Sequence, residues 1–267
     1  MSLPFFGPHM FDLWLYLLGL TLVIGAAFLT WLLSVYLRNV AIVDTLWSVL
    51  FALLAWTYAL GQTQLGPRAE WVLLLVTLWA LRLSIHITRR NWGHPEDRRY
   101  QAIRARNEPH FALKSLYLVF VLQALLAWFI SLPLLGAIAS REAFTGLDYA
   151  GGALWLIGFV FEAGGDWQLA RFKATPGNED KVMDRGFWAL TRHPNYFGDF
   201  CVWWGLYLAA LSAGAWWSLP GPLLMSILLL RVSGVALLEK DIAERRPQYA
   251  EYIRRTNAFF PGPRKPA

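Results

Sequence analysis

The segment RHPNYFGD, residues 192–199, places a guanidinium, an imidazole, an amide, a phenol and a carboxylate within eight residues. An apolar segment, residues 200–213, follows directly. Such side chains suit a polar, phosphate-bearing ligand, because Arg192 supplies a cation and the start of a helix supplies backbone donors. We therefore expect a site for such a ligand at a membrane surface, and its candidate residues in this segment are Arg192, His193, Asn195, Tyr196 and Asp199.

Further ionisable residues lie within apolar segments, where each is costly unless paired or hydrated. They are Asp44, Arg82, His86, Glu162, Asp166 and Arg231. Arg82 and His86 are four residues apart and share one helix face, as do Glu162 and Asp166. One alternative is that these groups only pair with one another, for instance Arg82 with Asp44 or Arg231 with Asp199. Together they favour one polar cavity open to the cytoplasm that could take a charged, phosphate-bearing ligand. Its cations would be supplied by Arg171, Lys173, Arg192 and Arg231.

The C-terminal segment adds the remaining cofactor candidates, which are Glu239, Tyr249, Tyr252 and Arg255. Tyr249, Tyr252 and Arg255 recur at helical spacing, so they can close over the cavity as a lid. The alternative is an amphipathic helix at the membrane interface, with its aromatic side chains in lipid.

The elements that position these residues are predicted to be membrane-spanning helices. Of the 267 residues, 57% are hydrophobic and only 16% are charged. Apolar stretches of about 20 residues, enough to cross a bilayer, recur along the chain. The fold class is therefore all-α: a polytopic membrane protein with about seven transmembrane helices and a cytoplasm-facing cofactor cavity. The expected helices are 11–37, 40–60, 68–88, 112–134, 147–170, 196–213 and 219–239.

Basic residues set the expected orientation. With the N-terminus outside, twenty of the 24 Lys and Arg residues fall in the cytoplasmic segments, and only Arg68 and Arg141 in outer ones. This positive-inside bias explains the net charge of +6 without nucleic acid. We expect an integral protein of a bacterial inner membrane, with its C-terminus in the cytoplasm and its first helix retained rather than cleaved as a signal peptide.

The chain is expected to be one integral membrane domain, 1–267, with substrate-side helices in 1–140 and a cofactor-binding half in 147–262. The single cysteine, Cys201, excludes an internal disulfide, and the five His residues lack paired spacing, so no metal is expected. No obligate protein partner is evident. The expected partners are the bilayer and a lipophilic small molecule.

RHPNYFGD, then Arg231, LLEKD and YAEYIRRT…FFPG resemble the C-terminal half of the membrane steroid and sterol reductases. This group includes the steroid 5-alpha-reductases and the sterol delta-14 reductases, and the resemblance spans about residues 150–262. It implies NADPH bound from the cytoplasmic side and a steroid-like enone as substrate. It also implies a cofactor site that includes Asp166, Arg171, Lys173, Asn195, Tyr196, Asp199 and Arg231. At position 199 the steroid 5-alpha-reductases usually carry Glu and the sterol reductases Asp, so the substrate subclass stays open.

The resemblance also implies that an acid of the second helix polarises the substrate carbonyl together with a tyrosine of the third. Asp44 matches the acid. The third helix offers Arg82, Ser84 and His86 where the tyrosine is expected, and Tyr100 lies beyond its end. Asp44 would donate if burial kept it protonated, or it would orient His86 or Arg82 as the donor.

The resulting hypothesis is NADPH-dependent reduction of a carbon–carbon double bond conjugated to a ketone. Charge developing on the carbonyl oxygen needs a donor in a water-poor site. NADP is favoured over NAD because several cytoplasmic basic residues suit a 2′-phosphate, and the absence of GxGxxG excludes a Rossmann site.

Two rival functions stay open at this stage. The first is an S-adenosylmethionine-dependent membrane methyltransferase of the isoprenylcysteine carboxyl type, since those proteins share the RHPxYxG turn and a similar tail. Asn195, Asp199 and the pair Arg171 and Lys173 favour the reductase. The second rival is a transporter or lipid-binding protein, but the sequence contains no inverted repeat.

Overall fold

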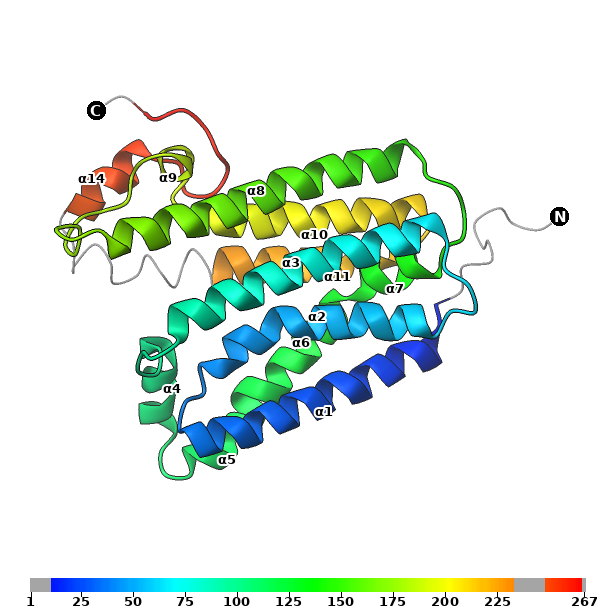
Figure 1. Ribbon diagram of the computed structural model, residues 1–267, viewed down its shortest axis with the longest axis horizontal. Coiled ribbons are helices and arrows are strands. Elements are labelled where there is room, and N and C mark those ends of the chain that lie inside the picture. Colours follow the sequence, from blue (N-terminus) through cyan, green and yellow to red (C-terminus); the bar gives the residue numbers. More distant parts are fainter. Residues whose placement is uncertain (1–10, 233–247, 266–267) are drawn as a thin grey trace. The chain divides into compact units, whose positions relative to one another are not determined.

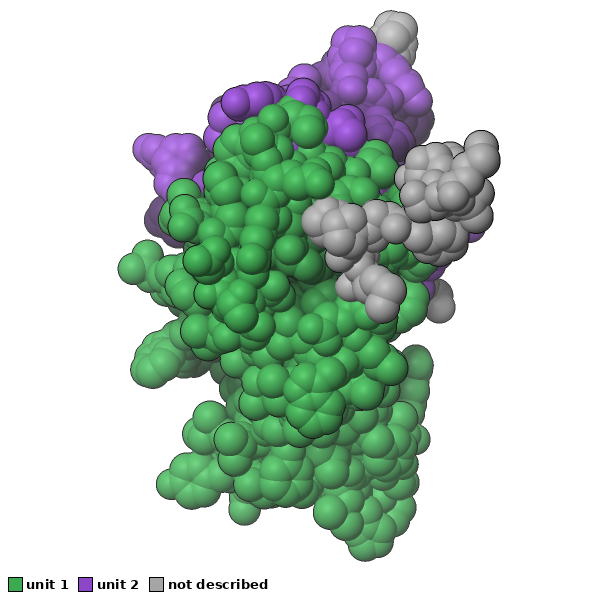
Figure 2. Space-filling view, turned by 90° about the vertical axis from the view of Figure 1, so that its right-hand side faces the viewer, with its two compact units in different colours: residues 1–145, 209–221 green, residues 146–208, 222–267 purple. Residues whose placement is uncertain are grey.

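The computed structural model describes residues 11–232 and 248–265, and the regular secondary structure in these ranges is entirely helical (Figure 1). The chain divides into two compact units, which Figure 2 colours separately. Unit 1 consists of Met1–Thr145 and Ala209–Gly221, and unit 2 of Gly146–Leu208 and Pro222–Ala267.

Unit 1 begins with three long helices, followed by shorter ones. They are α1 (Leu13–Leu37), α2 (Ile42–Leu60), α3 (Pro67–Asn91), α4 (Arg98–Asn107), α5 (Phe111–Ser115), a π-helical stretch (Leu116–Val121), α6 (Leu122–Ile130) and α7 (Leu132–Ala139). A short 3₁₀ turn, Trp216–Ser218, also belongs to this unit.

Unit 2 contains the remaining helices in the described ranges. They are α8 (Gly146–Ala174), α9 (Phe187–Leu190), α10 (Pro194–Ser212), α11 (Pro220–Ile227), a π-helical stretch (Leu228–Val232) and α14 (Gln248–Arg255). The last four residues of α10 and the first two of α11 are counted with unit 1.

Four helical segments are long and apolar enough to cross a membrane: Leu13–Leu37, Ile42–Leu60, Pro67–Asn91 and Phe111–Ala139. They correspond to the first four spans expected from the sequence and identify an integral membrane protein. The other three expected spans are helical over their described residues except at the ends, where Ala213 and Leu219 lie in turns. Helices α8 and α10 fall below the others in hydropathy, because they contain buried acids and glycines, and Trp216–Val232 is a shorter apolar helix.

Close side-chain packing organises the core of unit 1. Phe51 of α2 meets Trp79 of α3 edge to face, with ring centroids 5.7 Å apart. Tyr16 of α1 stacks on Trp128 of α6 at 4.1 Å, and the Trp128 indole donates to the Tyr16 carbonyl at 2.8 Å. Because lipid tails are as apolar as leucine, such packing and interhelical hydrogen bonds, rather than burial from water, hold membrane helices together.

Helices α8 and α10 approach each other closely in unit 2. A Cβ on Gly158 would lie 2.5 Å from the carbonyl oxygen of Gly198, and one on Gly205 would lie 2.6 Å from that of Gly151. Glycine is therefore required at this crossing. The contact fixes the first turn of α10 against the stretch of α8 that carries Glu162 and Asp166.

Candidate functional site

Asp44 is the centre of a polar cluster in unit 1. It lies in the first turn of α2, where the helix dipole favours a carboxylate. Its Oδ1 accepts a hydrogen bond of 2.5 Å from the Tyr100 hydroxyl. Its Oδ2 accepts one of 2.8 Å from Arg99 Nη2 and lies 3.9 Å from Arg90 Nη2. The Asp44 side chain is 14% exposed and that of Arg99 is 36% exposed, so the carboxylate is shielded from water more than its cationic partner.

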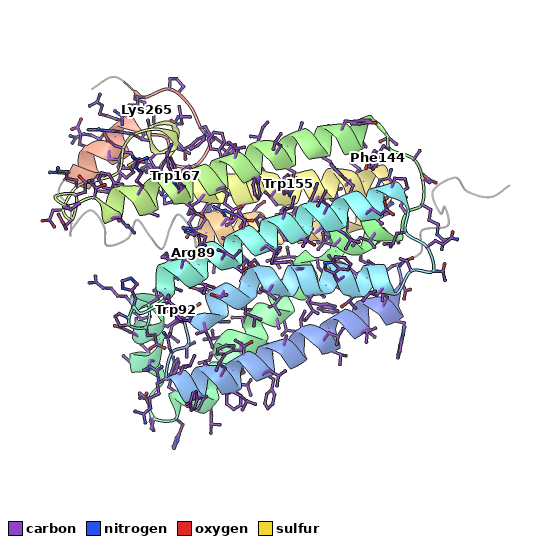
Figure 3. All side chains as sticks on the ribbon, in the orientation of Figure 1. Arg89, Trp92, Phe144, Trp155, Trp167 and Lys265 are labelled. Atoms are coloured by element: carbon purple, nitrogen blue, oxygen red, sulfur yellow. The ribbon has the colours of Figure 1, made fainter. Side chains whose placement is uncertain are left out.

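Helix α4 carries two of these partners, and its start is fixed by local hydrogen bonds. Asp97 caps the helix by accepting from the backbone N–H of Arg99 at 2.9 Å. Glu96, just before it, accepts from the backbone N–H of Val40 at 2.8 Å and from Arg104 through two bonds. The segment before α4 is thereby fastened to the turn that precedes α2, which holds Tyr100 at Asp44. Figure 3 labels Arg89 on the last turn of α3 and Trp92 where the chain leaves it towards α4.

Tyr100 is 6% exposed, and burial raises the pKa of its hydroxyl well above the ordinary value. The negative charge of Asp44 raises it further, while Arg99 and a hydrogen bond from Gln123 Nε2 at 3.3 Å act in the opposite sense. The phenol therefore stays protonated at neutral pH. A buried, protonated hydroxyl next to a carboxylate is a hydrogen-bond donor suited to a developing oxyanion.

Arg99 also contacts Asp97, with Nε donating to Oδ1 at 3.0 Å. Burial opposes ionisation of Asp97, but the hydrogen bonds and positive charge of Arg99 outweigh it and lower the pKa of that carboxyl. Arg99 thus bridges two acids, and its own pKa is raised because Asp44 and Asp97 outweigh the effect of its burial.

The described contacts of Asp44 do not include Arg82 or His86. The hydroxyls of Thr45 and Thr88 lie 3.2 Å apart, which sets residue 45 of α2 level with residue 88 of α3. Arg82 therefore lies about 9 Å further along α3 at the usual helical rise. The expected pair of Arg82 with Asp44 is replaced by pairs with Arg99 and Tyr100. Roles for Arg82 and His86 in catalysis stay predictions.

The second cluster is the turn that starts α10 in unit 2. Asn195 Nδ2 donates to Oδ1 of Asp166 at 3.3 Å, which links α10 to α8. The rings of His193 and Tyr196 stack with centroids 5.8 Å apart. His193, Asp166 and Asp199 are all buried. The structure thus brings together most of the candidates that the turn and α8 supply.

Arg192 and Tyr252 connect this turn to the C-terminal segment. Arg192 Nη1 donates to the carbonyls of Ile253 and Thr256 at 3.1 and 2.8 Å, at the end of α14. The Tyr252 hydroxyl donates to the carbonyl of Trp188 at 2.6 Å. Tyr249 and Tyr252 are buried, and the Tyr252 bond fastens α14 to the segment before α10. Whether these residues also contact a cofactor stays a prediction.

The remaining cofactor candidates lie at the edges of the cluster. Arg171 and Lys173 are exposed in the last turn of α8, with the Arg171 guanidinium 5.5 Å from the Trp167 ring. Arg231 is exposed, and no ion pair with Asp199 is recorded for it in the described ranges. Glu239 lies outside the described residues. No cluster of potential metal ligands occurs within residues 11–232 and 248–265.

Tyr100, Arg99 and Gln123 are the site residues that the sequence did not assign. The resemblance implied a tyrosine on the third helix, whereas Tyr100 lies on α4, the short helix that follows. The signal was the segment Glu96-Asp97-Arg98-Arg99-Tyr100, in which a helix-capping acid is placed three residues before the tyrosine.

Comparisons with known proteins identify a family for this chain. The family described as "Protein of unknown function (DUF1295)" matches residues 30–256. The chain belongs to the DUF1295 family. This is a membrane family that resembles the steroid 5-alpha-reductases. The chain is also 26% identical to an uncharacterized protein of Schizosaccharomyces pombe, over 92% of this chain and 79% of the relative. No solved structure matches it.

Proposed function

We propose that this DUF1295 protein is an NADPH-dependent membrane oxidoreductase that reduces a carbon–carbon double bond conjugated to a ketone in a lipophilic substrate. The observation that carries the proposal is the 2.5 Å hydrogen bond between Tyr100 and Asp44. It is the kind of pairing of an acid with a tyrosine that the resemblance to the steroid reductases implies at the substrate carbonyl.

NADPH would supply the hydride that adds to the β carbon of the enone. The carbonyl oxygen then gains negative charge, and a buried donor stabilises it far better than water-exposed groups do. Tyr100 has one proton, so it turns from Asp44 towards that oxygen when substrate binds. Arg99 stays on Asp44 and offsets its charge. Protonation at the α carbon completes the addition of one hydride and one proton across the double bond.

Donor and acceptor chemistry in unit 2 fits a dinucleotide. The buried carboxylate of Asp166 and the amide of Asn195 match the hydrogen-bonding needs of ribose hydroxyls and a carboxamide. Arg171 and Lys173 follow on the same helix, about 7 to 10 Å along its axis from Asp166. Cations at that spacing suit the charge of a 2′-phosphate, which favours NADPH over NADH.

Ligand-dependent thermal stability tests the cofactor. The detergent-purified protein is melted with NADPH, NADH or S-adenosylmethionine, since a ligand at a hundred times its Kd adds about 2.7 kcal/mol. We expect NADPH to stabilise the wild type and Asp44→Asn, but not Asn195→Ala. Stabilisation by S-adenosylmethionine alone would make the methyltransferase the better assignment, and stabilisation by none of the three would reject both enzymes.

Turnover tests the reaction. NADPH oxidation is followed by absorbance with 3-keto-4-ene steroids and simpler enones in mixed micelles, and the product is identified as the saturated ketone. Asp44→Asn should bind NADPH normally and turn over slowly. If Asp44→Asn turned over at the wild-type rate, the proposal that the substrate carbonyl binds at Tyr100 and Asp44 would be contradicted.

A further inference from the structure

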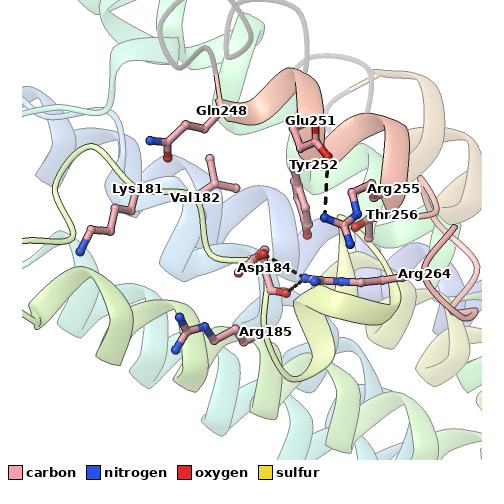
Figure 4. A pocket seen from close by; sticks show the side chains of 10 residues that line it. All are labelled: Lys181, Val182, Asp184, Arg185, Gln248, Glu251, Tyr252, Arg255, Thr256 and Arg264. Carbon is pink, nitrogen blue, oxygen red and sulfur yellow. Dashed lines mark hydrogen bonds and ion pairs between the residues drawn. The ribbon is translucent and has the colours of Figure 1, made fainter. Parts of the chain in front are cut away.

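A pocket of about 370 Å³ opens in unit 2 between the loop at 181–185 and α14 (Figure 4). Six of its lining side chains are charged: Lys181, Arg185, Arg255, Arg264, Asp184 and Glu251. Four positive charges against two negative ones leave a formal charge of +2. We propose that this pocket binds a phosphate group, supplied either by a soluble ligand or by an anionic lipid head group. The proposal does not depend on the function proposed above.

The two acids of the pocket are already engaged by cations. Arg264 Nη2 donates to Oδ2 of Asp184 at 3.0 Å and also to its backbone carbonyl. Glu251 accepts from Arg254 at 2.6 Å, and its other oxygen lies 3.7 Å from Arg255 Nη1. Figure 4 shows Asp184 with Arg264, and Glu251 with Arg255, at the wall of the pocket. The acids therefore orient arginines rather than repel an incoming anion.

Donors without partners line the same pocket. Arg255 Nε and the Thr256 hydroxyl are buried, and neither has a hydrogen-bond partner among the described residues. Thr256 as a whole is 1% exposed. Arg185 is exposed and pairs with no side chain in the part of the chain that the structure describes. A buried donor left unsatisfied is costly, and a phosphate oxygen would satisfy one.

The end of α14 would ordinarily disfavour an anion, because the carbonyls of a C-terminal turn carry negative partial charge. Here Arg192 lies against the carbonyls of Ile253 and Thr256 and offsets that charge. The same contacts join the pocket wall to the turn at 192–199. A bound phosphate should therefore stabilise the packing of α14 against the rest of unit 2.

Pyrophosphate is the soluble probe. The melting temperature of the purified protein in neutral detergent is followed against pyrophosphate, with chloride at matched ionic strength as the control for screening. We expect a saturable rise. Arg255→Gln should weaken apparent affinity about tenfold or more, because it removes a charge-assisted contact. Lys265→Gln is the matched control, since Lys265 is exposed and adjoins Arg264 but does not line the pocket.

The lipid source is tested separately, in nanodiscs of phosphatidylcholine with or without phosphatidylglycerol. A rise in melting temperature with phosphatidylglycerol that Arg255→Gln loses and Lys265→Gln keeps identifies a head group as ligand, even if pyrophosphate has no effect. Exposed Phe260, close in sequence to Arg264, suits such contact with a membrane surface. If Arg255→Gln does not fold, Thr256→Val replaces it in both experiments. This change keeps the side-chain shape and removes the hydroxyl donor, so it too should weaken binding. The proposal fails if neither probe gives a saturable rise beyond that of chloride, or if Lys265→Gln weakens binding as much as Arg255→Gln.

Discussion

Replacing Tyr100 by Phe removes one hydroxyl from the unit 1 site and leaves the ring in place. The lost bond, at 2.5 Å, is made to a carboxylate, so it should contribute about 1.5 to 3 kcal/mol to stability. The cost should lie at the lower end, because Asp44 keeps its 2.8 Å bond from Arg99. We expect a measurable fall in melting temperature with a folded protein.

The same change should affect turnover much more than stability. If the hydroxyl is the donor to the carbonyl oxygen, its loss should lower kcat by about a hundredfold to a thousandfold, as for other oxyanion donors. The KM for NADPH should stay unchanged, because no cofactor candidate is altered. Rates are measured at a temperature where wild type and variant are both fully folded.

Tyr117→Phe is the matched control, since Tyr117 is 58% exposed and lies in the π-helical stretch of the same unit. It should change neither stability nor kcat. A double-mutant cycle of Tyr100→Phe with Asp44→Asn should give a coupling of about 0.5 to 3 kcal/mol, since contacting residues are not additive. A Tyr100→Phe protein that reduces enones at the wild-type rate would refute the catalytic reasoning, whatever its melting temperature.

Three further changes test the structure itself. Arg192→Gln should loosen residues 248–255, because the carbonyls of Ile253 and Thr256 lose a charged donor. The loss should cost about 1.5 to 3 kcal/mol. Faster amide hydrogen exchange in residues 248–255 would show it. Gly158→Ala should cost about 1 to 3 kcal/mol, since its Cβ would meet the Gly198 carbonyl at 2.5 Å, and a melting temperature equal to wild type would contradict the close crossing. The folded-state pKa of Asp97 is depressed, so its contribution is present above an unfolded pKa of about 3.9 and is lost as pH falls below it. Acid titration of stability should accordingly be flatter in Asp97→Asn than in wild type.

The membrane class and the first four spans could be predicted from the sequence, because a run of apolar residues long enough for a bilayer leaves few alternatives to a helix. The later helices were harder. Helix α8 carries Glu162 and Asp166 among glycines, so its hydropathy falls although it is 29 residues long. Its polar and small residues serve the contact with α10, and hydropathy does not register that contact.

The candidate site was predictable where its residues lie close in sequence and not where they are distant. Asn195 and Asp199 stand out in one turn. Tyr100 reaches Asp44 from 56 residues away, and the join depends on the capping of α4 by Asp97 and on the bond between Glu96 and the turn at Val40. Acids in a short polar segment form such contacts in many proteins, and they leave no periodic pattern in the sequence. The sequence therefore does not indicate which tyrosine contacts Asp44.

The RHPNYFGD turn cannot by itself decide between a reductase and a methyltransferase, because part of it is architectural. Arg192 is engaged by the carbonyls at the end of α14, and Gly198 is required by the close approach of α8. Any membrane enzyme that docks a C-terminal helix in this way would need both, whatever its cofactor. The residues that can distinguish a reductase from a methyltransferase are those that do not hold α14 or the crossing of α8 with α10. Tyr100 and Asp44 are the main ones. A methyl transfer from S-adenosylmethionine builds no oxyanion that needs a buried phenol next to a carboxylate, whereas enone reduction does.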